Sequence, residues 1–270
     1  MSAPKRKKRL GQHHLKDGAL CRPLLDYLNL RSSPGQTLPH ILEIGPGGGI
    51  LTAELLAAGA RVTACEVDLE WAFHLLGLRR QYPDQLHLAA WDALAVDWAR
   101  MPTPTYAAGN LPFQVATKII ENLLLCHVQV PRAAFMVQKE VGERLVATPG
   151  TSAYGSLSVL VRACTSDARY LGTVKPGSFQ PPPKVSAAFI GLVLQPPPLP
   201  PGELPDFFKL VRLAFAKRRK TLRNSLSSGL GREHADKILT TLGWDANRRA
   251  EALDLDDFLE LYRVFSSRRD

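Results

Sequence analysis

The sequence predicts an α/β protein, in which helices cover both faces of a mostly parallel sheet and a small all-α domain follows. Two observations predict this fold. Strand-like and helix-like segments alternate between residues 40 and 138, and beyond a proline-rich stretch at 195–202 the apolar residues recur at helical spacing. We therefore expect a basic N-terminal arm with a cofactor-proximal motif at 1–22, an α/β domain at 23–200 and a helical domain at 201–270.

Strands are expected where short apolar runs end in glycine or polar residues, and helices where apolar residues recur every three or four positions. In chain order the expected strands are 40–45, 61–68, 86–92, 106–111 and 132–138, with helices around Leu51 to Leu56, at Leu69 to Arg80 and up to Leu125. The carboxyl ends of parallel strands share one edge, which is where ligands of such folds bind.

The domain boundary is expected in the run Gln195-Pro-Pro-Pro-Leu-Pro-Pro-Gly202, because proline can continue neither a helix nor a strand ladder. After it, apolar residues recur at helical spacing in three groups, which begin at Phe207, Ile238 and Leu253. We expect the second domain to be small and helical.

Basic residues concentrate at the two ends of the chain, whose net charge is +9. Residues 1–22 hold seven Lys or Arg and one acid, 23–202 hold thirteen of each sign, and 203–270 hold fourteen basic and eleven acidic residues. A neutral middle between cationic ends suits a catalytic core with extensions that bind nucleic-acid phosphates.

The apolar runs argue against a membrane protein. Stretches such as 123–125 are far shorter than the ~20 residues that cross a bilayer, and the first thirty residues hold no apolar run after their charges. The four cysteines are isolated from one another and from histidines, which favours free thiols in a reducing compartment and no metal. We expect a cytoplasmic protein.

The strongest local signal is Glu43-Ile-Gly45-Pro-Gly47-Gly-Gly49, between an expected strand and an expected helix. Glycines at such a turn let the backbone approach a ligand closely, so Gly45 and Gly47 are expected to bind one. A nicotinamide fingerprint would require glycine where Ile50 stands. The pattern resembles the first motif of class I S-adenosylmethionine (SAM) methyltransferases, although a tight turn alone would also explain it.

Acidic residues stand at the ends of the next two expected strands. Glu66 lies where a carboxylate accepts both hydroxyls of a ribose, with Asp68 as a competing candidate, and Asp92 can accept from the exocyclic amine of the cofactor's adenine. A single acid at a strand end is commonly a helix cap. The hypothesis of a cofactor site therefore depends on acids at successive strand ends facing the same ligand.

The segment Asn110-Leu-Pro-Phe113 ends the fourth expected strand. The N6 amine of adenine is a poor nucleophile, and the Asn110 amide oxygen and the Leu111 carbonyl can accept its two hydrogens. Pro112 fixes the turn and Phe113 can stack on an extruded base. The alternative is a proline turn with a core phenylalanine.

With these motifs, nearly the whole chain resembles the small-subunit (16S) ribosomal RNA adenine N6,N6-dimethyltransferases. Gly11-Gln-His-His-Leu15 is similar to the family's G-Q-N-F-L, and two later segments, Phe179 to Ser186 and Phe215 to Leu226, are similar to its F-x-P-x-P-x-V motif and C-terminal signature. The resemblance implies cofactor contacts from His13, Leu15, Gly45, Glu66, Asp92 and Asn110, and target-base contacts from Asn110, Leu111, Phe113 and Phe179.

Three positions depart from the family pattern. His13 stands where many members have Asn, His14 where Phe is usual, and Phe113 where Tyr is common. An imidazole still forms hydrogen bonds and a phenyl ring still stacks, so neither change removes a group that the expected function requires.

A basic run without acids extends from Lys209 to Arg223. Such runs are usually solvated faces, but its place beside the inferred base pocket favours contacts with RNA phosphates. The residues expected to bind RNA are Lys184, Lys217, Arg218, Arg219, Lys220 and Arg223. The arm at Lys5 to Arg9 is expected to order on RNA.

The resemblance implies SAM-dependent dimethylation, in two rounds, of two adjacent adenosines in the hairpin loop near the 3′ end of small-subunit rRNA. It also implies a partly assembled subunit as substrate and a role in subunit biogenesis. A monomer is expected. Three alternatives remain: a large-subunit adenine methyltransferase of the antibiotic-resistance type, a non-catalytic RNA-binding assembly factor and a DNA adenine methyltransferase.

Overall fold

The computed structural model describes residues 13–30, 39–100, 105–126, 130–217 and 220–267. The chain divides into two compact units. One comprises residues 1–142 and 165–195, and the other comprises residues 143–164 and 196–270.

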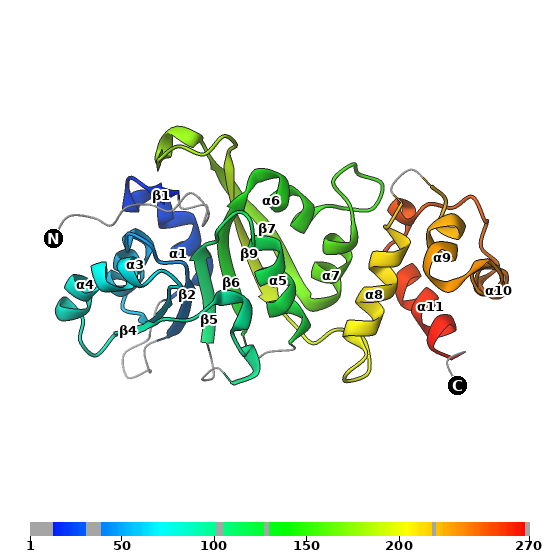
Figure 1. Cartoon of the computed structure of the whole chain (residues 1–270), viewed down its shortest axis with the longest axis horizontal. Helices are drawn as coiled ribbons and strands as arrows, with labels where there is room; N and C mark the ends of the chain where they lie inside the picture. Colours follow the sequence, from blue (N-terminus) through cyan, green and yellow to red (C-terminus); the bar gives the residue numbers. More distant parts are fainter. Residues whose placement is uncertain (1–12, 31–38, 101–104, 127–129, 218–219, 268–270) are drawn as a thin grey trace. The chain divides into compact units, whose positions relative to one another are not determined.

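The first unit is built on a seven-stranded sheet with the strand order β4-β3-β2-β5-β6-β9-β7 (Figure 1). Its parallel strands are β2 (His40–Ile44), β3 (Arg61–Cys65), β4 (Leu86–Ala89), β5 (Thr105–Asn110) and β6 (Arg132–Gln138). These are the five strands that the sequence predicts, and the α/β fold class is confirmed. Most of their residues are buried, because helices cover both faces of a parallel sheet.

Two further strands complete the sheet, and the sequence analysis did not predict them. β9 (Ala187–Leu194) runs antiparallel to β6, and β7 (Thr165–Val174) runs antiparallel to β9. A separate two-stranded ladder pairs β1 (His14–Leu15) with β8 (Phe179–Gln180).

The helices of the first unit are α1 (Arg22–Leu28), α2 (Ile50–Ala57), α3 (Leu69–His74), α4 (Leu76–Gln81), α5 (Ala116–Leu125) and the start of α6 (Lys139–Val146). Short 3₁₀ turns lie at η2 (Gly18–Cys21), η3 (Ala93–Ala95), η4 (Trp98–Arg100) and η5 (Pro176–Ser178). The single helix expected at 69–80 is divided at Leu75, close to Gly77, whose low helix propensity weakens a continuous helix there.

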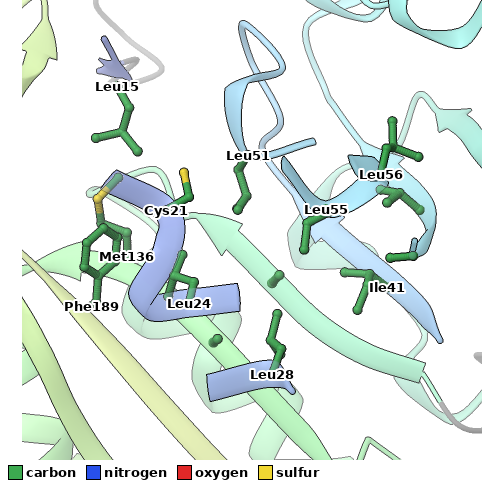
Figure 2. Close-up of a cluster of buried hydrophobic side chains, with 14 of the residues drawn as sticks. Leu15, Cys21, Leu24, Leu28, Ile41, Leu51, Leu55, Leu56, Met136 and Phe189 are labelled. Carbon is green, nitrogen blue, oxygen red and sulfur yellow. The ribbon is translucent and has the colours of Figure 1, made fainter. Parts of the chain in front are cut away.

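A core of buried side chains attaches the N-terminal segment to the sheet (Figure 2). Leu24 and Leu28 of α1 belong to the same buried cluster as Ile41 of β2, and Leu15 and Cys21 are members too. Residues 13–22 are therefore part of the first unit, although the sequence analysis assigned them to a separate arm. Residues 1–12 lie outside the described part of the chain.

The second unit contains α7 (Ser156–Cys164), α8 (Leu204–Ala214), α9 (Leu222–Leu230), α10 (Arg232–Leu242) and α11 (Leu255–Ser266), with η6 (Ala250–Ala252). The chain passes from the first unit to the second between Gln195 and Pro196, at the start of the proline-rich run and close to the expected boundary at residue 200. Residues 143–164 were expected to belong to the α/β domain, but they pack on the C-terminal helices and belong to the second unit. The Tyr154 hydroxyl donates to the Leu253 carbonyl at 2.9 Å, and its ring packs edge-on against Phe215.

No helix in the described ranges combines the length and apolar character that crossing a bilayer requires.

Candidate active site

A pocket of about 270 Å³ opens at the carboxyl edge of the parallel strands. Loops that follow β2, β3, β4 and β5 line it, together with the residues around β1. The lining includes the predicted site residues His13, Gly45, Gly47, Glu66, Asp92, Asn110, Leu111, Pro112 and Phe113. The structure thus gathers in one place residues that the sequence spreads over a hundred positions.

The loop after β2 has a backbone that only glycine adopts readily. Gly45, Gly47 and Gly49 have φ values of +68°, +50° and +79°. A Cβ on Gly47 would lie 2.3 Å from Cε1 of His14, and the Gly48 N–H donates to Nδ1 of His14 at 3.2 Å. The loop therefore lies directly against β1, and His14 takes part in holding it.

Glu66 lines the pocket, and the residue is only 6% exposed. Its two carboxylate oxygens accept the N–H groups of Gly47 at 3.1 Å and Asp68 at 3.0 Å. Burial raises the pKa of Glu66, while these backbone donors favour its ionised form. Asp68 is absent from the pocket lining and instead caps α3 through the Glu70 N–H. Of the two candidates, Glu66 is thus the one placed at the site.

Asp92 lies at the pocket margin and accepts the Leu94 N–H at 2.9 Å, which holds its carboxylate at the start of η3. Val67 and Trp91, about half exposed, line the same pocket. An acceptor beside apolar surface is suited to a purine ring with an exocyclic amine.

Asn110 is oriented by the chain segment that precedes β1. Its amide nitrogen donates to the His13 carbonyl at 2.8 Å, which leaves the amide oxygen as an acceptor. The Leu111 N–H donates to the Met136 carbonyl at 3.0 Å, and the Phe113 ring lies 5.7 Å from the His13 ring. The sequence analysis did not foresee that residue 13 positions Asn110 through its backbone.

Two predicted contacts are located elsewhere. Phe179 is fully buried in the core, because β8 pairs with β1 and sets Phe179 opposite Leu15. It is absent from the pocket lining, so this structure does not show the predicted contact of Phe179 with the target base, which stays a prediction. Leu15 is 6% exposed and lines a smaller hollow beside the main pocket.

A second pocket, of about 200 Å³, lies within the second unit and is rich in basic residues. Lys217 and Lys220, both predicted to bind RNA, line it together with Arg144 and Arg249. The sequence analysis missed these two arginines because they stand about 70 and 30 residues away from the basic run. We call this set of four cations the basic pocket.

The other predicted RNA contacts are not part of the basic pocket. Arg223 forms a bidentate ion pair with Asp236, at 2.5 Å and 2.6 Å, so its guanidinium is committed to α10. Lys184 is exposed between β8 and β9. Arg218 and Arg219 lie outside the described residues.

The residues of the main pocket fit SAM. A buried carboxylate at a strand end can accept ribose hydroxyls, and Gly45 and Gly47 of the glycine loop line the same pocket. Among the residues that the structure describes, no group of three or more His, Cys, Asp or Glu side chains could hold a metal ion.

The pocket fits SAM, and the amide oxygen of Asn110 beside it can accept a hydrogen from an exocyclic amine. These two features together are typical of SAM-dependent methyltransferases that modify the amino groups of bases. Within that class, the chain belongs to the ribosomal RNA adenine dimethylase family, whose sequence model matches residues 3–267. Its methyl donor is SAM.

Among curated proteins, the chain is 39% identical over 262 residues to "Ribosomal RNA small subunit methyltransferase A" of Syntrophotalea carbinolica, and the match covers 96% of each chain. A protein of the same name from Acidithiobacillus ferrooxidans is 39% identical over 264 residues, with 96% of this chain and 94% of the relative covered.

Two solved structures share the fold. A dimethyladenosine transferase from Plasmodium falciparum superimposes with a TM-score of 0.74 at 23% identity, over 94% of this chain and 98% of that one. The 23S rRNA methyltransferase ErmE gives 0.64 at 23% identity, over 93% and 99%.

Proposed function

We propose that this enzyme transfers methyl groups from SAM to N6 of two adjacent adenosines in the hairpin loop near the 3′ end of small-subunit rRNA. The main support for the proposal is the orientation of Asn110. Its amide nitrogen is bonded to the His13 carbonyl, so its amide oxygen is left as an acceptor at the pocket. The names of the relatives at 39% identity support the small subunit as substrate. We infer that the enzyme contributes in this way to small-subunit biogenesis.

The residues of the turn after β5 position the amine. The amide oxygen of Asn110 and the carbonyl of Leu111 accept the two N6 hydrogens, which draws the nitrogen lone pair out of conjugation with the ring. Pro112 fixes the turn, and Phe113 offers a face for stacking the extruded base. In the second round one of the two acceptors faces the methyl group already added.

When bound, SAM supplies a methyl group on a positively charged sulfonium, so the protein acts mainly by positioning. Alignment of two reactants contributes up to roughly 7–11 kcal/mol in favourable cases. N6 would gain a bond to the methyl carbon as the bond from that carbon to sulfur breaks, with the neutral thioether as leaving group, and N6 would give its proton to solvent, so the chain needs no dedicated base.

Mapping of methylated positions tests this function. Small subunits from cells that lack the protein should acquire dimethyladenosine at two adjacent positions when incubated with the enzyme and labelled SAM. Methylation of isolated large-subunit RNA alone would support the resistance-type enzyme, and methylation of DNA would support the DNA enzyme. Failure to bind SAM in calorimetry would favour a non-catalytic assembly factor.

The basic pocket is proposed to bind RNA phosphates. We expect the double variant Lys217→Ala/Lys220→Ala to bind small subunits or their RNA about tenfold more weakly, because each ammonium–phosphate interaction contributes on the order of 0.5–1 kcal/mol. The slope of log K against log salt should become shallower by roughly 0.7–0.9 for each phosphate that is no longer neutralised. Filter binding at several salt concentrations measures both quantities.

Lys237→Ala is the matched control for this experiment. Lys237 also lies in the second unit, but its ammonium is paired with Glu233 at 2.7 Å. Its removal should leave the salt slope unchanged. An equal decrease of affinity in the control would mean that general charge, and not the basic pocket, attracts the RNA.

We infer that the enzyme acts as a cytoplasmic monomer on a partly assembled subunit. Four free thiols among the described residues support a reducing compartment, since none forms a disulfide. Sedimentation of the purified protein, alone and with small subunits, tests the monomeric state and the partner together.

A further inference from the structure

His14 is a histidine in the wall of the cofactor pocket for which the mechanism above has no role. It lines the main pocket and also the smaller hollow beside it. The chain departs here from the family pattern, in which phenylalanine is usual. An imidazole differs from a phenyl ring by two nitrogens that form hydrogen bonds and by its ability to take up a proton near neutral pH.

The hydrogen bond between His14 and the glycine loop defines the state of the imidazole. The Gly48 N–H donates to Nδ1 of His14 at 3.2 Å. A backbone N–H can only donate, so Nδ1 carries no hydrogen and the neutral ring has its hydrogen on Nε2. An imidazolium has hydrogens on both nitrogens and cannot accept this bond. The contact is therefore available only while His14 is neutral.

Packing holds the ring of His14 in this position. It lies against the ring of Trp71, with 4.4 Å between the centroids, and Trp71 is only 2% exposed. On the side of the loop, a Cβ on Gly47 would collide with Cε1 of His14. The backbone of His14 is paired with Gln180 of β8. The ring cannot turn away without losing these contacts, so Nδ1 stays directed at Gly48.

The hydrogen bond to Gly48 fixes a turn that also positions Glu66. The Gly47 N–H donates to Glu66 at 3.1 Å, so side chains from two different segments hold successive N–H groups of this turn. Gly47 and Glu66 both line the main pocket. A change at Gly48 is therefore transmitted to the glycine loop and to the carboxylate that suits the ribose of the cofactor.

We propose that neutral His14 positions the glycine loop for SAM by accepting the Gly48 N–H, and that protonation of its imidazole releases the loop and weakens binding of the cofactor. The proposal rests on SAM as the cofactor and adds a positioning residue to its site. The proton comes from solvent and returns to it. A second effect has the same direction, because an imidazolium in the pocket wall has the same sign of charge as the sulfonium of SAM.

Other titratable or charged groups surround His14 and must be separated from it. Burial raises the pKa of Glu43 to about 8 and also raises the pKa of Glu66, so these acids titrate in a range that overlaps with that of a histidine. The groups on the surrounding elements are His13 and Lys16 on its own segment, Glu43 on β2, Cys65 and Glu66 at the end of β3, Asp68 and His74 at the two ends of α3, and Asp92 after β4. A pH profile of the unaltered protein alone is therefore not sufficient.

Two variants separate the acceptor from the ring. Asparagine places Oδ1 as many bonds from Cβ as Nδ1 of histidine, so His14→Asn can accept the Gly48 N–H at every pH. His14→Phe keeps an aromatic ring beside Trp71 but has no acceptor. At pH 7.5 we expect His14→Asn to bind SAM within about twofold of the unaltered protein, and His14→Phe to bind it about fivefold more weakly, which is the effect of one net hydrogen bond.

Calorimetry of SAM binding to the full chain at pH 5.5, 6.5 and 7.5 measures the pH dependence. The affinity of the unaltered protein should fall about fivefold more than that of His14→Asn from pH 7.5 to pH 5.5, because acid removes the acceptor only from histidine. His14→Phe should follow His14→Asn within about twofold over this range. His74→Asn is the matched control and should keep the profile of the unaltered protein, because His74 packs edge-on against Trp71 and is absent from the lining of both pockets.

Kinetics and spectra test the role of His14 independently of the affinity profile. At pH 7.5, His14→Phe should raise the KM for SAM and leave the rate at saturating SAM within about threefold of normal. ¹⁵N NMR of the unaltered protein, with His14 assigned by through-bond correlations, should show Nδ1 without a hydrogen at pH 7.5. Bound SAM should move the titration of His14 to lower pH by about one unit. The NMR measurement requires no variant, so it remains decisive if a substitution at position 14 prevents folding.

Equal pH dependence in the unaltered protein and in a folded His14→Asn variant would overturn the proposal and leave the methyltransferase function standing. A hydrogen on Nδ1 of the neutral ring would do the same, as would a defect of His14→Phe in the rate at saturating SAM with an unchanged KM. If the unaltered protein binds no SAM at any pH, the cofactor assignment itself fails, which is a distinguishable result.

Discussion

Asn110→Ala should reduce the rate of methyl transfer to small subunits about 100- to 1,000-fold, the range found when one positioned hydrogen-bonding group is removed from a reacting centre. The variant loses the acceptor for an N6 hydrogen and also the hydrogen bond from the amide nitrogen to the His13 carbonyl. Single-turnover transfer of labelled methyl groups, with enzyme in excess over subunits, measures the rate without a contribution from product release.

The decrease should fall on the rate of the bound complex and not on RNA affinity, because the basic pocket lies in the other unit. Asn247→Ala provides the control, since Asn247 is an asparagine outside the main pocket. If Asn110→Ala retains more than about a third of the normal rate, the amide is not the acceptor that the geometry suggests.

The parallel strands of the sheet could be predicted from the sequence because a strand that is buried on both faces contains a short apolar run, which is visible without knowledge of its neighbours. In His40–Ile44 the four residues after His40 are buried, and in Arg132–Gln138 the five residues between the two ends are apolar and buried. The position of an acid or asparagine at the end of such a run then places it at the ligand edge. This reasoning holds for Glu66, Asp92 and Asn110, all of which line the pocket.

Antiparallel additions to the sheet leave a weaker signal. In β7 most side chains are exposed or half-buried, and the strand contains Gly172 at a register irregularity, so neither a continuous apolar run nor a regular alternation is present. The pairing of β1 with β8 depends on partners more than 160 residues apart. That pairing buries Phe179, which a motif comparison alone had assigned to the target base.

Counting charges along the chain also misses contacts between residues that are distant in sequence. Arg223 stands in a run without acids, yet Asp236 reaches it from α10, thirteen residues later. Conversely, Arg144 and Arg249 join Lys217 and Lys220 only through the packing of the second unit. Arg249 is itself paired with Glu251 at 3.5 Å, so neighbours in space, and not in sequence, decide both which cations share a pocket and which are held in ion pairs.

Gly109→Ala should destabilise the first unit by about 3 kcal/mol, an effect at the upper end of the overpacking range. A Cβ at this position would lie 2.3 Å from the Ile44 carbonyl oxygen and 3.2 Å from the Ile44 nitrogen. These are backbone atoms of β2, held by pairing with β3 and β5, so they cannot move aside as a flexible side chain would. Thermal unfolding should show a decrease in melting temperature of about 6–12 °C.

Gly77→Ala distinguishes this clash from the general effect of adding a methyl group. Gly77 lies in α4, and a Cβ there would meet no atom within 4 Å. Because alanine favours a helix over glycine, this control should be neutral or more stable by up to about 1 kcal/mol. Gly109 directly precedes Asn110, so the same substitution should also slow methyl transfer in the protein that remains folded. A Gly109→Ala variant with normal stability and normal activity would show that β2 and β5 can separate, and the close approach of these strands would then not be what positions Asn110.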